Sequence, residues 1–528
     1  MKKKLVIIFS ISFALYAQTK NSVYNIKDFG AKGDGITLNT AAIQKAIDEC
    51  SKTGGVVLVP AGKYLTGALE LKSNVEVYLS TGAIILGSTN IKNYQAHKPK
   101  LESYNDYFLK YSLFYAEKVR NISIDGNGTI DGQGKAFKVK TKKKPERYEN
   151  RPFIIRFVEC RNVSVQNVTL KNSAMWMEQY LACDGLTIRG IKVFNHANQN
   201  NDMMDIDGCK NVIISDCIGD TDDDGITLKS TSPESVENVV ITNCIISSHC
   251  NAVKIGTEST GDFKNIAISN IVVKPSSVKK VIFGAPEGTS GITLTTVDGG
   301  NIDGITISNI RIDGPEVPIF LRLGNRARKY KENASLPTVG EFENVNINNV
   351  VADNVKSIGC SITGIPNHFI NNISLSNIII NYSGGVNRNG YKDEVPELAN
   401  NYPEGNMWGN LPSYGFYVRH VENISFSNIE LNYKEKDVRP AFACDDVKGI
   451  YLTGIKAECD SDAKSFLSFS NVRDGKIYDS ESKTGTNLFL DLEGDQNNNI
   501  KLFGNDFTNF RKIYNESKGT VMLEGNFQ

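Results

Sequence analysis

The sequence predicts an all-β fold, a single-stranded right-handed parallel β-helix with one short capping helix at its N-terminal end. Three observations predict it: a short phrase recurs along the chain, its apolar residues alternate with period two, and its corner residue is repeatedly asparagine. Short alternating strands rich in Ile and Val need a cover for their apolar face. In a β-helix each coil is covered by its neighbours, so stability accumulates by stacking.

The recurring phrase is a turn residue, an alternating apolar run, a polar pair and a second apolar run, as in RNVSVQNVTL from Arg161. Further copies begin at Asp184, Lys210, Glu237, Lys264, Asp303, Glu343, Asn371, Glu422 and Lys448. The intervals between successive corner residues are 23, 26, 27 and 27 residues, counted over Asn167, Gly190, Asp216, Asn243 and Asn270. Such intervals are too short for a βαβ unit of about 30 residues or more. They fit one coil of a parallel β-helix, and the wider gaps later in the chain predict loops inserted into single coils.

The repeated corner asparagine has two physical uses. It tolerates the left-handed backbone conformation of a tight corner, and its amide can bond to the equivalent asparagine one coil along. We therefore expect asparagines to stack along an edge of the β-helix.

The two ends of a β-helix need caps that hide the apolar interior and the open strand edges. The segment NTAAIQKAIDEC, from Asn39, predicts a short amphipathic helix with Thr40 as its N-cap. The segments from Gly54 and Asn74, GGVVLVPAGKYL and NVEVYLSTGAIILGS, follow as the first coils. The repeat fades past about Asn471, so an accessory module after that point stays open.

Residues 1–17 indicate a secretory signal peptide. Lysines at positions 2–4 precede an apolar run over 5–15, and Ala17 is a small residue at the expected cleavage point. The run is too short to span a bilayer securely, although an uncleaved N-terminal anchor is the alternative. We expect a secreted or periplasmic protein whose mature chain, 18–528, is one monomeric β-helix domain with no membrane span.

Composition excludes some functions. The chain has 59 basic and 59 acidic residues, whereas a nucleic-acid-binding protein normally carries a concentrated basic face. The basic cluster Lys138–Lys144 predicts a solvated loop, or a loop at the mouth of a groove for an anionic substrate. Ten scattered cysteines could form disulfides or remain buried thiols. No CxxC pair occurs and the five histidines lie far apart, so neither a metal site nor a cofactor is expected.

Two neighbouring coils concentrate seven carboxylates, namely Asp202, Asp205, Asp207, Asp220, Asp222, Asp223 and Asp224. Asp202 and Asp223 are 21 residues apart, nearly one coil, so they should lie side by side. Crowded like charges cost stability and raise pKa values. Paired carboxylates for glycoside hydrolysis are the favoured explanation, with a calcium site or solvated turns as alternatives. Asp205 and Asp207 are expected to support the turn.

Three motifs follow one another about one coil apart: Asn200-Asn201-Asp202, Asp223-Asp224 and His249. Their order resembles the glycoside hydrolases of family 28, the polygalacturonases and rhamnogalacturonan hydrolases, and the similarity begins at NIKDFGAKGDG, residues 25–35. The resemblance implies a pectin-lyase-like solenoid that hydrolyses a polysaccharide or oligosaccharide with inversion. It implies that Asp223 is the general acid, that Asp202 and Asp224 hold and deprotonate the water, and that His249 supports the acid.

The sequence departs from the family pattern at three places. Asn201 replaces a threonine, His249 lacks its flanking glycines, and the Arg-x-Lys motif that grips a uronate carboxylate has no clean match. Candidate replacements are Lys254, Arg322 and Arg326, because basic side chains suit a sugar carboxylate. Asn200 is a further expected substrate contact.

A long insertion between two late coils begins at Asn387 and is rich in Tyr, Pro and Gly. Aromatic faces stack on sugar rings, and loops on a rigid scaffold carry specificity. Substrate contacts are therefore expected from Tyr402, Trp408, Arg419 and His420. A wall of this kind would close one end of the groove and favour exo action.

Three functions are compatible with such a fold, because the fold alone selects none of them. The leading hypothesis is a hydrolase of an acidic or rhamnose-containing polysaccharide. The second is a lyase or dehydratase that removes the C5 proton of a uronate, with Lys254, His249 or Tyr402 as base. The third is a non-catalytic carbohydrate-binding β-helix, against which the acidic cluster argues.

Overall fold

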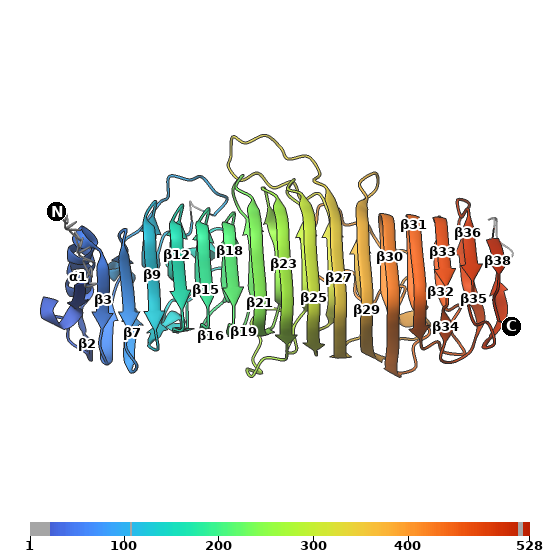
Figure 1. The fold of residues 1–528 in the computed structure, drawn as a ribbon, viewed down its shortest axis with the longest axis horizontal. Coiled ribbons are helices and arrows are strands. Elements are labelled where there is room, and N and C mark those ends of the chain that lie inside the picture. The colour runs from blue at the N-terminus through green and yellow to red at the C-terminus, as the bar shows by residue number, and fades with distance from the viewer. Residues whose placement is uncertain (1–21, 106–107, 516–520, 528) are drawn as a thin grey trace, which may run out of the picture.

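The computed structural model describes residues 22–105, 108–515 and 521–527. Its strands β1–β38 join in one continuous parallel sheet, wound as a right-handed β-helix. Figure 1 shows an elongated solenoid with the N-terminal helix α1 at one end and β38 at the other. The predicted fold class is confirmed. The expected signal peptide lies outside the described residues, and within them no helix is long and apolar enough to cross a membrane.

The coils stack into three faces. The first face consists of β1 (Ser22–Asn25), β3 (Gly55–Val59), β6 (Val75–Leu79), β9 (Arg120–Gly126), β12 (Arg161–Gln166), β15 (Asp184–Arg189), β18 (Lys210–Ser215), β21 (Val236–Ser248), β23 (Phe263–Val273), β25 (Ile302–Asp313), β27 (Phe342–Val355), β29 (Ile370–Gly384), β33 (Arg473–Tyr478), β36 (Ile500–Phe503) and β38 (Val521–Glu524).

The second face begins with separate short strands, and from β21 onward the same long strands continue around the corner into it. Its separate strands are β2 (Asp34–Leu38), β4 (Gly62–Thr66), β7 (Ala83–Gly87), β10 (Thr129–Asp131), β13 (Thr169–Lys171), β16 (Lys192–Asn195), β19 (Ile218–Thr221) and β34 (Glu481–Ser482).

The third face carries the carboxylate coils described below. Its strands are β5 (Leu69–Glu70), β8 (Ser112–Glu117), β11 (Phe153–Val158), β14 (Glu178–Leu181), β17 (Met204–Asp207), β20 (Ile226–Ser230), β22 (Asn251–Ser259), β24 (Ser290–Thr296), β26 (Val317–Leu323), β28 (Cys360–Thr363), β30 (Phe416–Glu435), β31 (Phe442–Ala457), β32 (Leu467–Ser470), β35 (Thr486–Glu493) and β37 (Phe510–Tyr514). Strands β30 and β31 run on around the corner into the first face.

The corner asparagines behave as the sequence predicts. All ten corner positions between Asn167 and Gly454 have positive φ, a conformation that asparagine and glycine adopt most readily. Their amides bond along the axis: Asn309 donates to Asn270 at 3.2 Å, and Asn349 donates to Asn309 at 3.1 Å. Each coil is therefore fixed to the next by side chains as well as by backbone.

The helix α1 (Thr40–Thr53) covers the first coils with Ile43, Ala46, Ile47 and Cys50. Thr40 is not the N-cap, because Asn39 holds that position. The Thr40 hydroxyl instead accepts a bond from the backbone N–H of Gly67 at 2.7 Å, so it ties the helix to the neighbouring coil. Short 3₁₀ helices occur in the described loops at η1 (Ile26–Phe29), η2 (Ile91–Asn93), η3 (Gly134–Ala136), η4 (Glu146–Tyr148) and η5 (Arg388–Gly390).

One apolar core fills the interior from Ile26 to Phe507. All ten cysteines are buried free thiols, which settles the choice between bridges and thiols that the sequence left open. The coils continue past Asn471, since β36 pairs with β33 and β38 pairs with β36. After Asn471 the recurring sequence phrase is therefore lost while the coils of the solenoid continue.

Candidate active site

Three of the clustered aspartates, Asp202, Asp223 and Asp224, line a pocket on the third face. Its volume is about 150 Å³, and its walls come from β20, β22 and from loops that reach over the face. The lining residues are Tyr104, Asn105, Phe108, Leu109, Lys144, Tyr148, Met175, Trp176, Asn200, Asp202, Asp223, Asp224, Lys229, Lys254, Glu258, Arg326, Arg328 and Tyr402.

Asp223 sits at the centre of the pocket, in the turn that leads into β20. One of its carboxylate oxygens accepts from the backbone N–H of Asp224 at 3.1 Å, and the other accepts from the Asn200 amide at 3.3 Å. Burial first, and the charge of Asp224 second, raise the pKa of Asp223 to about 6. A carboxyl group in this state can hold a proton in mildly acidic solution and give it up to a substrate.

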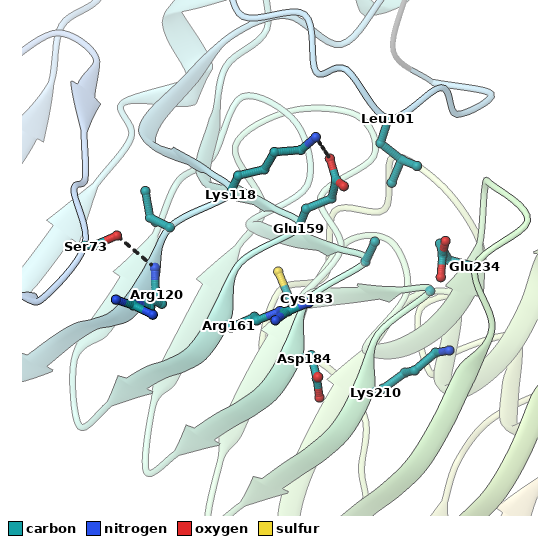
Figure 2. A pocket seen from close by; sticks show the side chains of 13 residues that line it. Ser73, Leu101, Lys118, Arg120, Glu159, Arg161, Cys183, Asp184, Lys210 and Glu234 are labelled. Atoms are coloured by element: carbon teal, nitrogen blue, oxygen red, sulfur yellow. Dashed lines mark hydrogen bonds and ion pairs between the residues drawn. The ribbon is translucent and has the colours of Figure 1, made fainter.

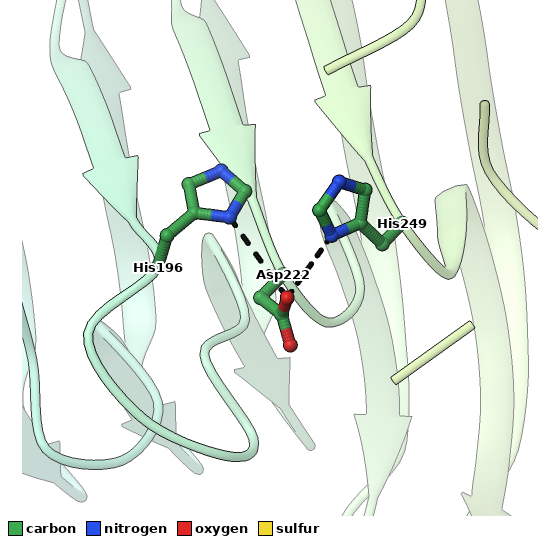
Figure 3. Close-up of side chains that lie close together, drawn as sticks. All are labelled: His196, Asp222 and His249. Carbon is green, nitrogen blue, oxygen red and sulfur yellow. Dashed lines mark hydrogen bonds and ion pairs between the residues drawn. The ribbon is translucent and has the colours of Figure 1, made fainter. Parts of the chain in front are cut away.

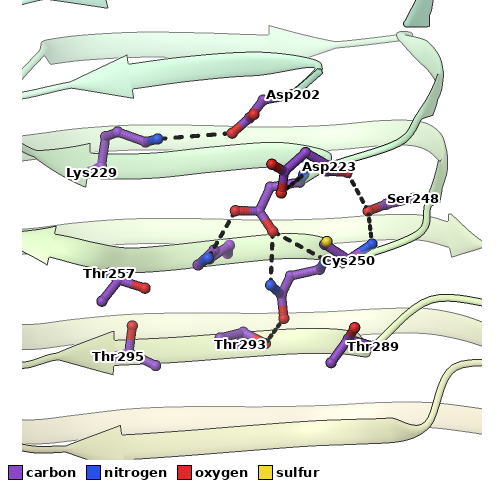
Figure 4. Close-up of polar contacts among 12 residues, drawn as sticks. Asp202, Asp223, Lys229, Ser248, Cys250, Thr257, Thr289, Thr293 and Thr295 are labelled. Atoms are coloured by element: carbon purple, nitrogen blue, oxygen red, sulfur yellow. Dashed lines mark hydrogen bonds and ion pairs between the residues drawn. The ribbon is translucent and has the colours of Figure 1, made fainter. Parts of the chain in front are cut away.

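Figure 4 shows Asp223 near Asp202, toward which Lys229 points. Asp224 is held by donors from the next coil. Its carboxylate accepts from Nζ of Lys254 at 2.8 Å and from the Asn251 amide at 2.8 Å. The backbone N–H of Asn251 also points to it, at 3.2 Å. Asp224 thus pairs with a buried ammonium group, whereas Asp223 accepts from neutral N–H groups, so the two neighbouring aspartates occupy different electrostatic environments.

Asp202 lies one coil before Asp223 and shares a buried cation with Asp205. Nζ of Lys229 lies 2.6 Å from Asp205 and 3.9 Å from Asp202, and it also sits 3.9 Å from the centre of the Trp176 ring. Burial, followed by the charges of Asp205 and Asp223, raises the pKa of Asp202 well above its usual range. Burial raises the pKa of Asp205 to about 7 despite Lys229.

Asp207 has the supporting role expected for it. Its carboxylate accepts from the backbone N–H of Thr231 at 2.8 Å, from the Thr231 hydroxyl at 2.7 Å and from the Gln179 amide at 3.0 Å. Because every one of these partners is a neutral donor, Asp207 fixes the course of the chain after β20.

Positively charged side chains also line the pocket. Arg328 pairs with Glu258 at 2.8 Å and stacks over Tyr104 at 3.5 Å from the ring centre. Arg326 pairs with Asp298 through two contacts. Lys144, from the basic cluster of the sequence, also reaches the pocket.

Two further arginines brace the aspartate turn. Arg147 and Arg151 each donate to the side-chain oxygen of Asn200, at 3.3 and 3.4 Å. Asn200 in turn donates to Asp223, so these arginines orient the central carboxyl through one intermediate. Burial and the charge of Arg147 lower the pKa of Arg151 to about 10.

The insertion brings Tyr402 to the pocket and Glu404 into hydrogen-bond contact with Asn251. The Tyr402 hydroxyl lies 3.2 Å from Nζ of Lys254. Burial raises the pKa of Glu404 to about 7, although Lys254 opposes that shift. Tyr402 was expected here, whereas Glu404 was not identified from the sequence.

His249 does not lie against the carboxyl of Asp223, which corrects the expectation from the motif order. Its Nδ1 faces Asp222 at 3.0 Å and its Nε2 donates to the carbonyl of Val278 at 2.9 Å. Cys250, Asn251 and Lys254 face the aspartates from this coil instead. The chain turns after His249, so the imidazole bonds to Asp222 while the Asn251 amide bonds to Asp224.

Four other predicted substrate contacts lie away from the pocket. Arg322 donates to backbone carbonyls of Gly364 and Glu397, and Trp408 donates to the carbonyl of Pro396. Arg419 donates to the carbonyl of Val395, and His420 bonds to Asp446. The insertion folds back on the third face. Its backbone carbonyls accept hydrogen bonds from side chains that the sequence analysis had assigned to substrate.

A larger hollow of about 680 Å³ lies at the start of the first face. Figure 2 shows its side chains, among which Lys118 pairs with Glu159 at 3.3 Å. Arg120 and Arg161 stand in register on neighbouring strands. This hollow lacks the aspartate cluster, so the chemistry of the lining, and not the volume, identifies the candidate site.

Several site residues missed by the sequence analysis lie one coil from a predicted one. Asp202 and Lys229 are 27 residues apart, and so are Asp224 and Asn251. Counting one coil forward from each aspartate would have found both. No such rule finds Glu404, which comes from an irregular loop.

Comparison with known proteins gives a consistent result. A sequence profile described as "Glycosyl hydrolases family 28" matches residues 50–392. A "Probable polygalacturonase" of Vitis vinifera is 36% identical over 217 residues, which cover 39% of this chain and 44% of that protein. An "Exo-poly-alpha-D-galacturonosidase" of Dickeya chrysanthemi is 48% identical over 120 residues, or 21% of this chain and 20% of that protein. The chain thus spans less than half the length of these two relatives.

Solved structures agree with the fold. An exopolygalacturonase from Thermotoga maritima superposes with a TM-score of 0.59 at 22% identity, over 78% of this chain and 92% of the other. A family 28 exopolygalacturonase of Yersinia enterocolitica gives a TM-score of 0.56 at 19% identity, over 88% and 79%. At these identities the superpositions establish a common architecture.

Proposed function

The chain belongs to the glycosyl hydrolases of family 28, and on that premise we propose that it hydrolyses glycosidic bonds next to galacturonate in an acidic polysaccharide or its oligosaccharides. The observation that carries the proposal is the pocket itself, where three aspartates from two adjacent coils share one lining with lysines and arginines. Carboxylates of unequal pKa are what glycoside hydrolysis requires.

Asp223 is proposed as the general acid. It would transfer its proton to the glycosidic oxygen as the bond to the anomeric carbon breaks. Its raised pKa, about 6, supports this role. Asn200, with Arg147 and Arg151 behind it, would hold the carboxyl toward the leaving group.

Asp224 and Asp202 are proposed to bind the water that attacks from the opposite side of the sugar. Asp224, held by Lys254 and Asn251, would be the carboxylate that accepts the proton of the water. One displacement of this kind inverts the anomeric configuration. His249 has no part in these steps.

A galacturonate carboxylate would be bound by the cations of the pocket. Lys144, Arg326 and Lys254 supply positive charge in the pocket lining. The pocket is small and covered by loops, which supports removal of single residues from a chain end, as the name of the Dickeya chrysanthemi relative indicates for that protein.

The test is digestion of homogalacturonan, rhamnogalacturonan and algal uronate oligosaccharides by the full chain and by Asp223→Asn. New reducing ends, release of monosaccharide and loss of both in the variant are expected. The matched control is Asp216→Asn, at an exposed corner of the same coils, which should keep full activity. The anomer formed first, read by NMR, tests inversion.

Elimination is the alternative outcome of the same digestion. Lys254 and Tyr402 lie 3.2 Å apart in the pocket and could serve as a base pair for C5 proton removal. An ultraviolet absorbance from an unsaturated uronate, rising with the new chain ends, would replace the hydrolytic roles proposed above.

We further propose that residues 1–17 direct export to the periplasm or beyond, and that the mature chain works as one catalytic β-helix and as a monomer. N-terminal sequencing of the processed protein should begin at Gln18. Light scattering should give the mass of one chain.

A further inference from the structure

A second polar cluster lies outside the lining of the catalytic pocket, at the corner between the second and third faces of the same coils (Figure 3). His196 follows β16, Asp222 follows β19 and His249 follows β21. They are 26 and 27 residues apart, so each stands one coil from the next. One nitrogen or oxygen of each lies within 4.8 Å of the others. The sequence analysis expected no metal site because its histidines are far apart along the chain, yet in a solenoid one coil of separation means contact.

The protons on His196 follow from its surroundings. Its Nε2 lies 2.9 Å from Asp220, whose carboxylate also accepts from the hydroxyls of Ser276 and Ser277 at 2.6 Å each. These bonds place the proton of a neutral imidazole on Nε2. The side chain is only 6% exposed, and its buried Nδ1 has no hydrogen-bond partner among the residues that the structure describes, 4.0 Å from the Oδ1 of Asp222. An unpaired nitrogen lone pair therefore faces a carboxylate oxygen.

His249 has the matching arrangement from the other side. Its Nε2 must donate, because the carbonyl of Val278 can only accept. Its Nδ1 then faces the same Oδ1 of Asp222 at 3.0 Å. Both imidazoles thus direct Nδ1 at one carboxylate oxygen, and both have the remaining N–H anchored.

We propose that His196, Asp222 and His249 bind one divalent transition-metal ion of the Zn²⁺ class. Two imidazole nitrogens and one carboxylate oxygen form a ligand set that Zn²⁺ prefers. The outer contacts fit as well, since metal-binding histidines usually donate their second N–H to a carboxylate or a backbone carbonyl. Asp220 and Val278 supply these two partners. An ion between the three ligands would also satisfy the lone pair of His196.

The site would anchor the loop that follows β23. Asp222 accepts from the backbone N–H groups of Ile282 and Phe283 at 2.9 and 3.2 Å. The Phe283 ring in turn packs against Arg147, 5.4 Å from its guanidinium carbon. Metal binding would therefore stabilise this loop without entering the catalytic pocket.

The test is a titration of the chelator-treated full chain with ZnCl₂ by calorimetry and with CoCl₂ by visible absorption. One equivalent of each ion should bind, and Co²⁺ should give weak ligand-field bands without an intense thiolate band. Zn²⁺ should raise the melting temperature of the wild type, because it binds only the folded state. Binding should weaken as pH falls, since protons compete for the imidazoles.

Two variants locate the ion. His196→Ala should abolish the one-equivalent binding and the rise in melting temperature, whereas Asp220→Asn should weaken binding by about tenfold to 100-fold, the usual effect of losing an outer partner. His368→Ala, at an exposed histidine, is the matched control and should bind as the wild type does. Should His196→Ala fail to fold, Asp220→Asn still tests the site.

Three outcomes would overturn the proposal: a wild type that takes up no equivalent of either ion, a His196→Ala variant that binds as tightly as the wild type, or a strong thiolate band with Co²⁺. None of these readouts depends on hydrolysis. Failure here therefore leaves the proposed glycosidase activity untouched.

Discussion

The corner asparagines and the clustered aspartates both lie one coil apart from residues of the same type, but the asparagines bond to one another and the aspartates repel one another. At the corner each amide donates to the oxygen one coil back, as Asn270 does to Asn243 at 3.3 Å. In the carboxylate coils burial, together with the charges of neighbouring carboxylates, raises the pKa values of Asp202, Asp205 and Asp223.

The difference follows from what a solenoid does to any side chain placed on it. Side chains that have both a donor and an acceptor can form a hydrogen-bonded row of any length along the axis, because each one bonds to the side chains before and after it. A residue with acceptors only accumulates repulsion, which cations such as Lys229 and Lys254 must offset. The hydrogen bonds at the corner stabilise the fold, whereas the carboxylate coils hold carboxyl groups of raised pKa that acid catalysis can use.

The largest effect is expected from Asp223→Asn. Removing the proposed general acid should lower kcat/KM by about 10³-fold. Stability should be unchanged or slightly higher at pH 7, because a carboxyl whose pKa is raised on folding destabilises the folded state once it ionises. Activity assays and thermal melts at pH 7 and pH 4 check both parts. A large loss of stability would place Asp223 among the structural residues instead.

Lys229→Met should show how much of the repulsion between the carboxylates the buried lysine offsets. The side chain is 4% exposed, so its removal leaves Asp202 and Asp205 without a counter-charge and should cost about 3 kcal/mol of unfolding free energy. The loss should be greater at pH 8 than at pH 5, because these carboxyls take up protons at lower pH. The matched control is Lys264→Met, an exposed pair with Asp262, which should cost less than about 1 kcal/mol.

The pH profile of kcat/KM should sharpen the same contrast. Asp223 must carry its proton, so activity should fall about tenfold per unit above a pKa of about 6. Lys254 lowers the pKa of Asp223, so Lys254→Met should move this alkaline limb to higher pH in whatever activity remains. An unmoved limb would assign the titration to another group.

The smallest effect is expected at the corner. Asn270 has φ 56° and bonds to Asn243 and Asn309. Asn270→Ala should cost about 1–2 kcal/mol, since it loses exposed hydrogen bonds and strains a left-handed backbone. Asn270→Gly removes only the bonds and should cost less. Denaturant unfolding of the pair separates the two contributions, and equal losses would show that the side-chain bonds dominate.

The repeat made most of the fold predictable, because alternation and spacing are local properties of the chain. The ends were less accessible: Thr40 stands one residue inside the helix that it was expected to cap, and the solenoid continues past Asn471 without the familiar phrase. Both lie toward the ends of the solenoid, outside the run of regular copies of the recurring phrase.

The aspartates of the site could be found because seven like charges on two coils are unusual. His249 could not be placed, because the alternation of side chains breaks at the turn after β21. Its ring faces Asp222, whereas Asn251, two positions later, faces Asp224. The insertion was beyond prediction for a related reason. Tyr402 reaches the pocket while Trp408 packs on Arg322, and no periodicity in that segment distinguishes them.

The ten buried thiols have a practical consequence. They are distributed from Cys50 to Cys459 along the solenoid axis, none is bridged, and each is shielded in the native state. The chain should therefore mature without oxidative chemistry and yield the same enzyme from a reducing cytoplasm. A shielded thiol reacts only when its surroundings open. The rate at which each cysteine is alkylated would therefore measure local unfolding at that point, and the ten positions together would map local stability along the solenoid.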